Sequence, residues 1–140
     1  MIRYCFDTDV VSTMLKAHPP LSLVRRVAGV PPGEQCTTSI TAGELLYGAA
    51  RLDQNRLVER VRAIIDYAQN VLPFDQAAAE IYGPLRARLE AEGRRLAEPD
   101  LRIASIALLH DLTLVTGNVR HFTRVPDLRV ENWLEVPAGP

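Results

Sequence analysis

Several features of secreted and membrane proteins are missing from this 140-residue sequence. It has only 2 cysteines, Cys5 and Cys36, which lack metal-ligand spacing and are too few for a disulfide framework. No apolar run approaches the ~20 residues that cross a bilayer, and the amino terminus reaches Asp7 too early for a signal peptide. We therefore expect a cytoplasmic protein whose two thiols are free and buried.

The sequence also has few lysines and little net charge. Of the 16 basic residues only Lys16 is a lysine, and 17 acidic residues bring the net charge to −1. Chemistry that needs a lysine therefore has a single candidate. The near-zero charge argues against a generic nucleic-acid coat protein, but it allows an enzyme with a basic rim around an acidic centre. Arginine suits such a rim because its guanidinium binds phosphate through two hydrogen bonds.

Common catalytic patterns are absent as well. No pair among the 3 histidines has the spacing of a zinc site. The sequence has no nucleophile elbow with a Ser-His-acid order and no glycine-rich phosphate loop. An active site in this chain would therefore be built from other polar residues.

The composition is that of an ordinary globular domain, with 47% hydrophobic and 24% charged residues. A chain of this length buries about two-thirds of its unfolded surface, so it needs no metal or disulfide to fold. We expect one domain over residues 1–135 and a loose tail over 136–140.

Apolar, β-prone segments alternate with helical patterns along the chain. Strands are expected at residues 2–6, 36–40, 70–74, 112–116 and 128–130. Helices are expected after a cap at Thr8 or Asp9, over 21–30, after a cap at Ser39 or Thr41, and over 53–68, 75–92 and 99–109. Such alternation predicts an α/β fold with three α/β/α layers around a parallel sheet of about five strands.

Some side chains are expected to fix this core. The apolar stripe from Leu57 to Ala68 fits either core packing or a dimer seam, and core packing is favoured. Trp133 is expected to be a core or edge anchor. The helix over 75–92 is expected to kink at Gly83-Pro84 and to end at Gly93.

Polar residues follow the ends of the predicted strands. Asp7 ends the first strand, Glu44 lies one turn into the helix after the second, and Asn118 follows the fourth. Asp100 begins the helix that leads into the fourth strand. Because sites in open parallel sheets lie beyond the carboxyl ends of the strands, these four side chains can meet at one edge.

Carboxylates held close together repel one another unless they bind protons or a cation. Oxygen ligands select a hard divalent ion such as Mg²⁺ or Mn²⁺, which activates water and stabilises phosphoryl charge. Each acid also has a plainer interpretation: Asp100 as a helix cap, Asp7 as an Asx turn or cap, and Glu44 as part of a solvated face. Their shared placement is what favours a metal site.

Four segments together resemble a known family over nearly the whole chain. They are Phe6-Asp7-Thr8-Asp9-Val10-Val11-Ser12, Ser39-Ile40-Thr41-Ala42-Gly43-Glu44-Leu45-Leu46-Tyr47-Gly48, Pro99-Asp100-Leu101-Arg102-Ile103-Ala104 and Leu114-Val115-Thr116-Gly117-Asn118-Val119-Arg120-His121-Phe122. In this order and spacing they resemble PIN-domain ribonucleases of the VapC toxin type, from type II toxin–antitoxin systems.

The resemblance implies a metal-dependent endoribonuclease that leaves a 5′-phosphate and a 3′-hydroxyl. Asp7, Glu44 and Asp100 would hold Mg²⁺, with Mn²⁺ as a substitute, and Asn118 would complete the catalytic set. Thr8, Asp9 and Thr116 would orient ligands or water, and Arg120 and Arg86 would contact RNA phosphate. The family further implies a homodimer, higher toxin–antitoxin complexes and a cognate antitoxin that often inserts a basic side chain into the acidic site.

The sequence departs from the family pattern at two positions. Asp9 stands where the family often has Asn, and Asn118 stands where it often has Asp. A neutral Asn118 leaves less charge for a second ion, which favours one tightly bound metal, although Asp9 can partly compensate. The metal count, the RNA, the antitoxin, promoter binding and the dimer surface stay open at this point.

Two other functions fit parts of the sequence. A non-catalytic PIN-like module would bind RNA or protein without cutting it. The run Asp7-Thr8-Asp9-Val10-Val11 also resembles the opening of haloacid-dehalogenase-type phosphatases, where Asp7 is the nucleophile and Asp9 the acid/base. That fold needs a downstream lysine and a late acidic pair, whereas Lys16 comes too early and Asn118 is no acid.

Overall fold

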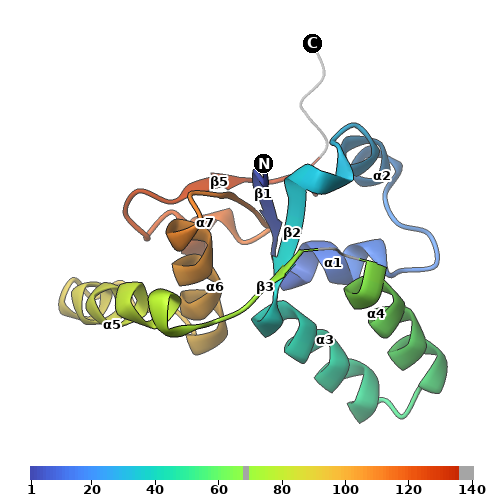
Figure 1. Cartoon of the computed structure of the whole chain (residues 1–140), viewed down its shortest axis with the longest axis horizontal. Helices are drawn as coiled ribbons and strands as arrows, with labels where there is room; N and C mark the ends of the chain where they lie inside the picture. Colours follow the sequence, from blue (N-terminus) through green and yellow to red (C-terminus); the bar gives the residue numbers. More distant parts are fainter. Residues whose placement is uncertain (68–69, 136–140) are drawn as a thin grey trace.

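A five-stranded sheet lies at the centre of the computed structural model, which describes residues 1–67 and 70–135 (Figure 1). The strand order is β3-β2-β1-β4-β5, and all neighbouring strands are parallel. This confirms the expected α/β fold with about five strands. The expected tail at 136–140 and the end of the stripe at Ala68 lie outside the described residues. The strands are β1 (Tyr4–Phe6), β2 (Gln35–Thr38), β3 (Val71–Leu72), β4 (Thr113–Val115) and β5 (Arg129–Glu131).

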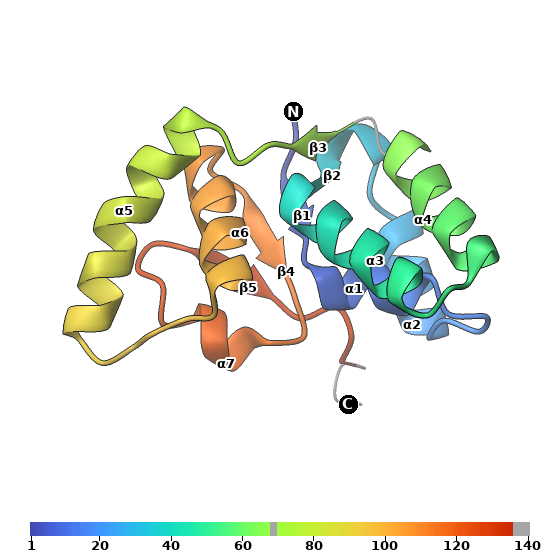
Figure 2. The ribbon, with the colours of Figure 1, turned by 90° about the horizontal axis from the view of Figure 1, so that it is seen from below.

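Helices cover both faces of the sheet, which gives the three predicted layers (Figures 1 and 2). One face carries α1 (Thr8–Met14), α2 (Leu21–Ala28), α3 (Ser39–Arg51) and α4 (Asn55–Tyr67). The other face carries α5 (Gln76–Ala91), α6 (Glu98–Leu109) and the short α7 (Val119–Phe122). A 3-10 turn over Pro32–Glu34 leads into β2.

Alternating strand residues pack into two separate hydrophobic cores. Cys5 and Leu114, each fully buried, pack with residues of α5 and α6. Their strand neighbours Phe6 and Val115 point the opposite way and pack with α1 to α4. This is the two-residue period of a strand that is covered on both faces. Val61 of α4 is 1% exposed in the second core, which confirms that the predicted stripe faces the core.

The cap of α1 is Asp7, so the expected cap at Thr8 or Asp9 is wrong. Asp7 is extended, with φ −70° and ψ 164°, and its side chain accepts a hydrogen bond from the Thr8 amide at 2.8 Å. Because β1 ends at Phe6 and the helix starts at Thr8, only this one residue lies between them. The structure thus bears out the cap interpretation of Asp7 as well as its place at the strand end.

The second strand is shorter than expected, because Ser39 and Ile40 belong to α3. Thr38 caps this helix in place of Ser39 or Thr41: it is extended, and its Oγ1 accepts a hydrogen bond from the Thr41 amide at 3.1 Å. Thr38 pairs with Leu72 of β3 and is fully buried, so the strand continues up to the cap itself.

Helix boundaries elsewhere match the expectations more closely. α5 runs through Pro84 without a break, and Gly93, with φ 68°, ends the turn that follows it as predicted. α6 begins at Glu98, after an Ala97 cap without a side-chain hydrogen bond, so Asp100 is not the cap that one interpretation made it. No helix was expected at 119–122, where α7 lies.

Trp133 anchors the chain beyond β5, as predicted. It is 2% exposed, and its ring centroid lies 5.0 Å from that of Tyr4 and 5.4 Å from that of Phe6. The Arg26 guanidinium lies 5.0 Å from the indole centroid, and the indole N–H donates to Glu131 at 3.3 Å. Cys5 and Cys36 are free and buried, as expected, and no helix in residues 1–67 or 70–135 is long and apolar enough to cross a membrane.

Replacing Trp133 with Ala should reduce the free energy of unfolding by about 3–5 kcal/mol, because the change empties a site between two aromatic rings. Urea denaturation followed by far-UV circular dichroism measures this loss. Leu21→Ala is the control: Leu21 is 60% exposed, so its truncation should cost under about 0.5 kcal/mol. Equal losses in the two variants would contradict the anchoring role.

Candidate active site

Asp7 is a buried carboxylate at the end of the β1 strand, in the middle of the sheet. Asp7 is 3% exposed, and both oxygens of its side chain accept hydrogen bonds. Oδ1 accepts the Thr8 amide at 2.8 Å, and Oδ2 accepts the Thr116 hydroxyl at 2.7 Å. The Asp7 amide also donates to the Val115 carbonyl at 2.9 Å, so the ends of β1 and β4 are joined at this point.

Glu44 reaches the same region from the second turn of α3. Its Oε1 accepts a hydrogen bond from the Thr8 hydroxyl at 2.8 Å. The Thr8 hydroxyl oxygen lies 3.1 Å from the Thr41 hydroxyl oxygen. The Thr41 oxygen in turn lies 3.5 Å from the hydroxyl oxygen of the cap residue Thr38. A chain of hydroxyls therefore fixes the direction in which the exposed Glu44 carboxylate lies.

Asp100 lies in the first turn of α6 and is half-buried. Burial, followed by the charges of Glu44 and Asp9, raises its pKa, while His121 lowers it. Three carboxylates and one histidine from four different helices therefore act on one another electrostatically. Sequence reasoning missed His121, because its proximity to Asp100 depends on the unexpected helix α7.

The environment of Asp7 disfavours its charged form. The pKa of Asp7 is raised from its ordinary value of 3.8 to about 7. Burial is the largest cause and the charges of Asp9 and Asp100 act in the same direction, whereas the hydrogen bonds from Thr116 and Thr8 lower the pKa. A carboxyl group with a pKa near 7 among other acids is typical of sites where a positive charge is missing or arrives with a ligand.

Asp9 and Asn118 flank this cluster. Oδ2 of Asp9 accepts the Gly117 amide at 2.8 Å, and Oδ1 is buried without a hydrogen-bond partner among the residues described. Asn118 is exposed at the start of α7, and its amide donates to the Thr116 hydroxyl at 3.0 Å. Asn118 thus supports the residue that holds Asp7, and its own side chain makes no cap hydrogen bond.

The side chains present fit a divalent cation in their donor chemistry. The candidate ligands Asp7, Glu44 and Asp100 all offer carboxylate oxygens, and the charge of Asp100 acts on Asp7 while that of Glu44 acts on Asp100. In residues 1–67 and 70–135, no three His, Cys, Asp or Glu side chains lie close enough together to hold an ion between them. The donors therefore share one edge of the sheet without surrounding a common point.

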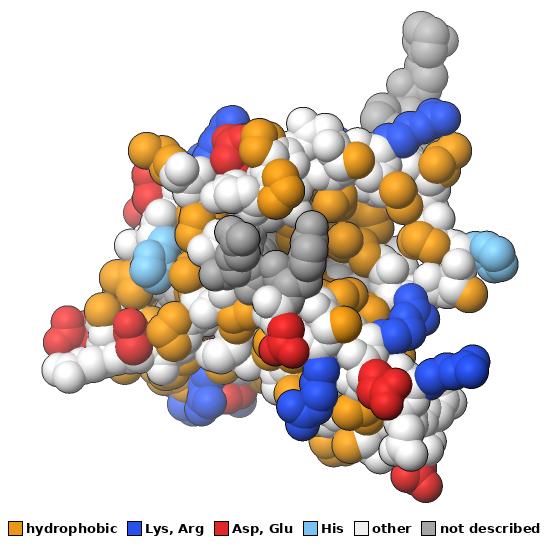
Figure 3. Space-filling view, turned by 45° about the vertical axis from the view of Figure 1, so that its right-hand side comes forward, with side chains coloured by type: hydrophobic (Ala, Val, Ile, Leu, Met, Phe, Trp, Pro, Cys, Tyr) orange, Lys and Arg blue, Asp and Glu red, His pale blue; other side chains and the backbone are white. Residues whose placement is uncertain are grey.

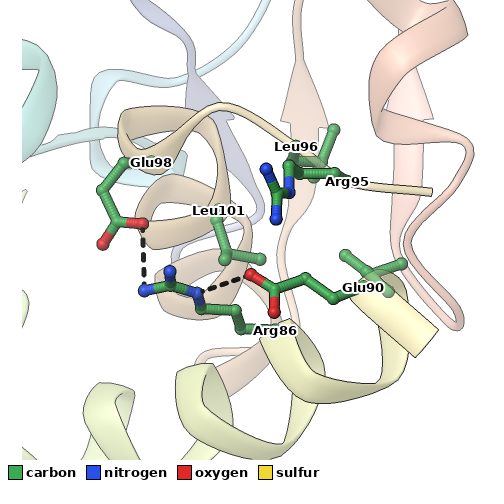
Figure 4. A pocket seen from close by; sticks show the side chains of 7 residues that line it. Arg86, Glu90, Arg95, Leu96, Glu98 and Leu101 are labelled. Atoms are coloured by element: carbon green, nitrogen blue, oxygen red, sulfur yellow. Dashed lines mark hydrogen bonds and ion pairs between the residues drawn. The ribbon is translucent and has the colours of Figure 1, made fainter. Parts of the chain in front are cut away.

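The two arginines predicted to contact RNA differ in their surroundings. Arg120 is exposed on α7, two residues after Asn118. Arg86 lies on α5 and lines a separate cleft of about 220 Å³ beside α6 (Figure 4). There its guanidinium donates to Glu90 at 2.9 Å and to the Tyr82 hydroxyl at 3.0 Å, and pairs with Glu98 at 3.7 Å. The structure therefore engages Arg86 in local contacts and leaves it outside the acidic cluster.

A larger apolar hollow of about 590 Å³ lies on the other face of the sheet. Figure 3 looks onto this face, where hydrophobic side chains gather around a depression. Its lining residues come mainly from β2, α1, α2 and α4, and they include Val11, Met14, Val27, Val30, Pro32 and Ile64. Leu21 and Val24 of α2 are also exposed, at 60% and 42%.

Asp7→Asn should stabilise the metal-free protein at pH 8 but not near pH 4. A folded-state pKa of about 7 means that the folded protein takes up a proton between about pH 4 and 7 that the unfolded chain does not. This uptake stabilises the fold at low pH, and the benefit is lost as pH rises through 7. Asn removes the buried charge, so Tm in EDTA should rise by about 5 °C or more at pH 8.

Thermal unfolding of both proteins at pH 4.5 and pH 8 measures this difference. Glu59→Gln, on the exposed face of α4, is the control and should change Tm equally little at both pH values. A gain for Asp7→Asn that is the same at both pH values would assign the effect to packing and not to charge.

Comparison with known proteins places the chain in a family. The sequence matches the PIN domain over residues 4–128. It is 35% identical over 137 residues to "Ribonuclease VapC2" of Haemophilus influenzae, covering 96% of this chain and 100% of that protein. It is also 35% identical to "tRNA(fMet)-specific endonuclease VapC" of Shigella flexneri, covering 95% and 99% of the two chains.

A solved structure agrees with these relatives. The crystal structure of VapBC2 from Rickettsia felis bound to a promoter DNA fragment contains a chain of the same fold, with a TM-score of 0.84 at 30% identity. The match covers 95% of this chain and 99% of that one. The chain therefore belongs to the PIN domain family and, within it, to the VapC ribonucleases.

Proposed function

We propose that the chain is the toxin of a type II toxin–antitoxin system and cuts RNA at the edge where Asp7, Glu44 and Asp100 lie. The observation that carries this proposal is that Asp7, Glu44 and Asp100 share one edge of the sheet, where the charge of Asp100 raises the pKa of Asp7 and the charge of Glu44 raises the pKa of Asp100. Its relatives of similar length are ribonucleases, and PIN-domain ribonucleases generally depend on a divalent metal.

Asp7, Glu44 and Asp100 are the proposed ligands of one Mg²⁺ ion, for which Mn²⁺ can substitute. Because the three side chains do not surround one point, some of them would reach the ion through its bound water. All three offer carboxylate oxygens, which hard divalent cations prefer. The bound cation would lower the pKa of water and offset negative charge on the phosphodiester. The neutral side chain of Asn118 adds no charge to this set, which favours a single ion over two.

The threonines are proposed to orient the acids. The Thr116 hydroxyl donates to Asp7 at 2.7 Å, and the Thr8 hydroxyl donates to Glu44 at 2.8 Å. Each bond restricts one carboxylate to one direction before RNA arrives, which reduces the entropy lost on binding. Asp9 belongs to the same supporting group through its hydrogen bond from Gly117.

The proposed products are a 5′-phosphate and a 3′-hydroxyl. Arg120 is the proposed contact to the RNA backbone, because it is exposed and close in sequence to Asn118. Arg86 stays a weaker proposal, since two glutamates already pair with its guanidinium. The name of the Shigella flexneri relative makes tRNA(fMet) the first defined RNA to test.

We further propose a cognate antitoxin and a cytoplasmic location, where a ribonuclease meets its RNA. The relative from Rickettsia felis was solved as a VapBC2 complex on promoter DNA. On this chain, the apolar hollow of about 590 Å³ and the exposed Leu21 and Val24 provide a surface that a protein partner can cover.

The isolated chain should also be a homodimer. Tyr47 of α3 and Leu52, which caps the end of that helix, are 68% and 54% exposed, and apolar exposure of this kind supports an interface between copies. Sedimentation equilibrium of the antitoxin-free protein should give twice the 15.5 kDa of one chain. A mass of one chain at micromolar concentration would contradict this proposal.

Purified, antitoxin-free protein should cut total cellular RNA and tRNA(fMet) into discrete fragments with Mg²⁺ and not with EDTA. Asp7→Asn, Glu44→Gln and Asp100→Asn should each lower the cleavage rate by more than the roughly 10–100-fold that is typical of residues outside the ligand set. Labelled RNA resolved on denaturing gels measures the rates, with Glu59→Gln as the control variant.

Three other results would change the proposal. Equal fragments in all lanes would indicate a contaminating nuclease. RNA binding without cleavage by a folded, Mg²⁺-binding protein would favour the non-catalytic module. Unchanged cleavage in all three acid variants would refute the proposed ligands.

A further inference from the structure

The loop from Thr116 to Asn118 joins β4 to α7 and is tied to two carboxylates of the site. The Thr116 hydroxyl donates to Asp7 at 2.7 Å, and the Gly117 amide donates to Asp9 at 2.8 Å. Asp7 and Asp9 lie at the cap and in the first turn of α1. Two neighbouring residues of the loop are thus bonded to two residues at the start of one helix.

The orientation of the Thr116 hydroxyl depends on this loop. Its oxygen accepts the Asn118 amide at 3.0 Å, so its own hydrogen is free to point to Asp7. If the loop moved, the Asn118 amide would leave the hydroxyl, and the hydroxyl would lose its fixed direction. The position of the loop therefore affects the carboxylate with the pKa near 7.

Glycine at position 117 leaves room for the loop to come this close without moving the side chains of Asp9 and Leu134. A β-carbon at this position would lie 2.7 Å from Oδ2 of Asp9 and 2.8 Å from Cδ1 of Leu134, closer than real β-carbons come to other atoms. Lack of space is what favours glycine here. No other described glycine has a neighbour within 3.0 Å of such a carbon. The close approach of Gly117 is what allows its amide to reach Asp9.

We propose that Asp9 is a positioning residue, which holds Thr116 and Asn118 in place through Gly117 and does not itself bind the cation. Of its two oxygens, one is used by Gly117 and the other is buried without a partner in the described residues. Its place in the first turn of α1 favours a negative charge there, because the helix amino terminus carries partial positive charge. The activity part of this inference rests on the proposed function, and the structural part does not.

Amide hydrogen exchange of Gly117 tests the structural part without any RNA. In ¹⁵N-labelled protein followed by NMR, Asp9→Ala should speed exchange of this amide by about tenfold or more, because it removes a charge-assisted hydrogen bond. Asp9→Asn keeps an acceptor oxygen and should leave exchange within about threefold of the unmodified chain. Equal exchange in all three proteins would overturn the inference.

Cleavage kinetics test the functional part. Asp9→Ala should lower kcat by about 10–100-fold, and Asp9→Asn should restore most of it. The Mg²⁺ concentration for half-maximal cleavage should stay within about threefold in both variants, as expected for a residue outside the ligand set. A tenfold or larger rise of that concentration in Asp9→Asn would instead make Asp9 a ligand and overturn the inference.

Gly117→Ala provides a second route if Asp9→Ala does not fold. Its added carbon should displace the Asp9 carboxylate and reproduce the kcat loss of Asp9→Ala. The double variant Asp9→Ala/Gly117→Ala should lose no more than Gly117→Ala alone, because both changes break one contact. Additive losses would refute this coupling. If the unmodified chain cuts no RNA, the proposed function fails, and the exchange result still decides the structural part.

Discussion

The central constraint on this molecule is a carboxylate, that of Asp7, buried at the end of the middle strand. β1 lies between β2 and β4, so the residue after it is covered from both sides, and Asp7 is 3% exposed. Burying a charge there costs free energy unless hydrogen bonds or a cation offset it. The Thr8 amide and the Thr116 hydroxyl supply two hydrogen bonds, yet the pKa still rises to about 7. The fold thus keeps a strained electrostatic site at its centre, as expected where a cation and a polyanion are to bind.

The amino termini of two helices offset part of the repulsion among these acids. Asp7 caps α1, Asp9 lies in the first turn of α1, and Asp100 lies in the first turn of α6. Helix amino termini carry partial positive charge, so each of these acids lies where a negative charge is favoured locally even though the acids repel one another. Since the helices of parallel βαβ units begin at the carboxyl edge of the sheet, the arrangement that gathers the acids also supplies the dipoles that stabilise them.

Much of the fold and of the candidate site could be predicted from the sequence, because apolar runs indicate which segments are buried. The strands, the burial of Cys5 and the placement of the acids at one edge follow from apolar runs and strand ends. The cap of α3 was predicted wrongly, since whether Thr38 or Ser39 caps this helix depends on how far β2 pairs with β3. His121 and Gly117 were missed for a related reason. α7 has only 4 residues, too few for a periodic signal, and the need for Gly117 arises from Leu134 and Asp9, distant in sequence.

An acidic centre must still attract RNA, which is a polyanion, although the chain carries a net charge of −1. Three of the arginines contribute little here, because Arg86, Arg88 and Arg102 are paired with glutamates of α5, of α6 or of the α5 cap. These pairs are exposed, so their contribution to stability is small, but they neutralise the outer face of α5 and α6. Arg120 has no ion pair among the described residues, and it is exposed beside the loop that supports Asp7. Arg120 therefore offers a positive charge at the edge of the acidic cluster, where the proposed backbone contact would place the scissile group near the carboxylates.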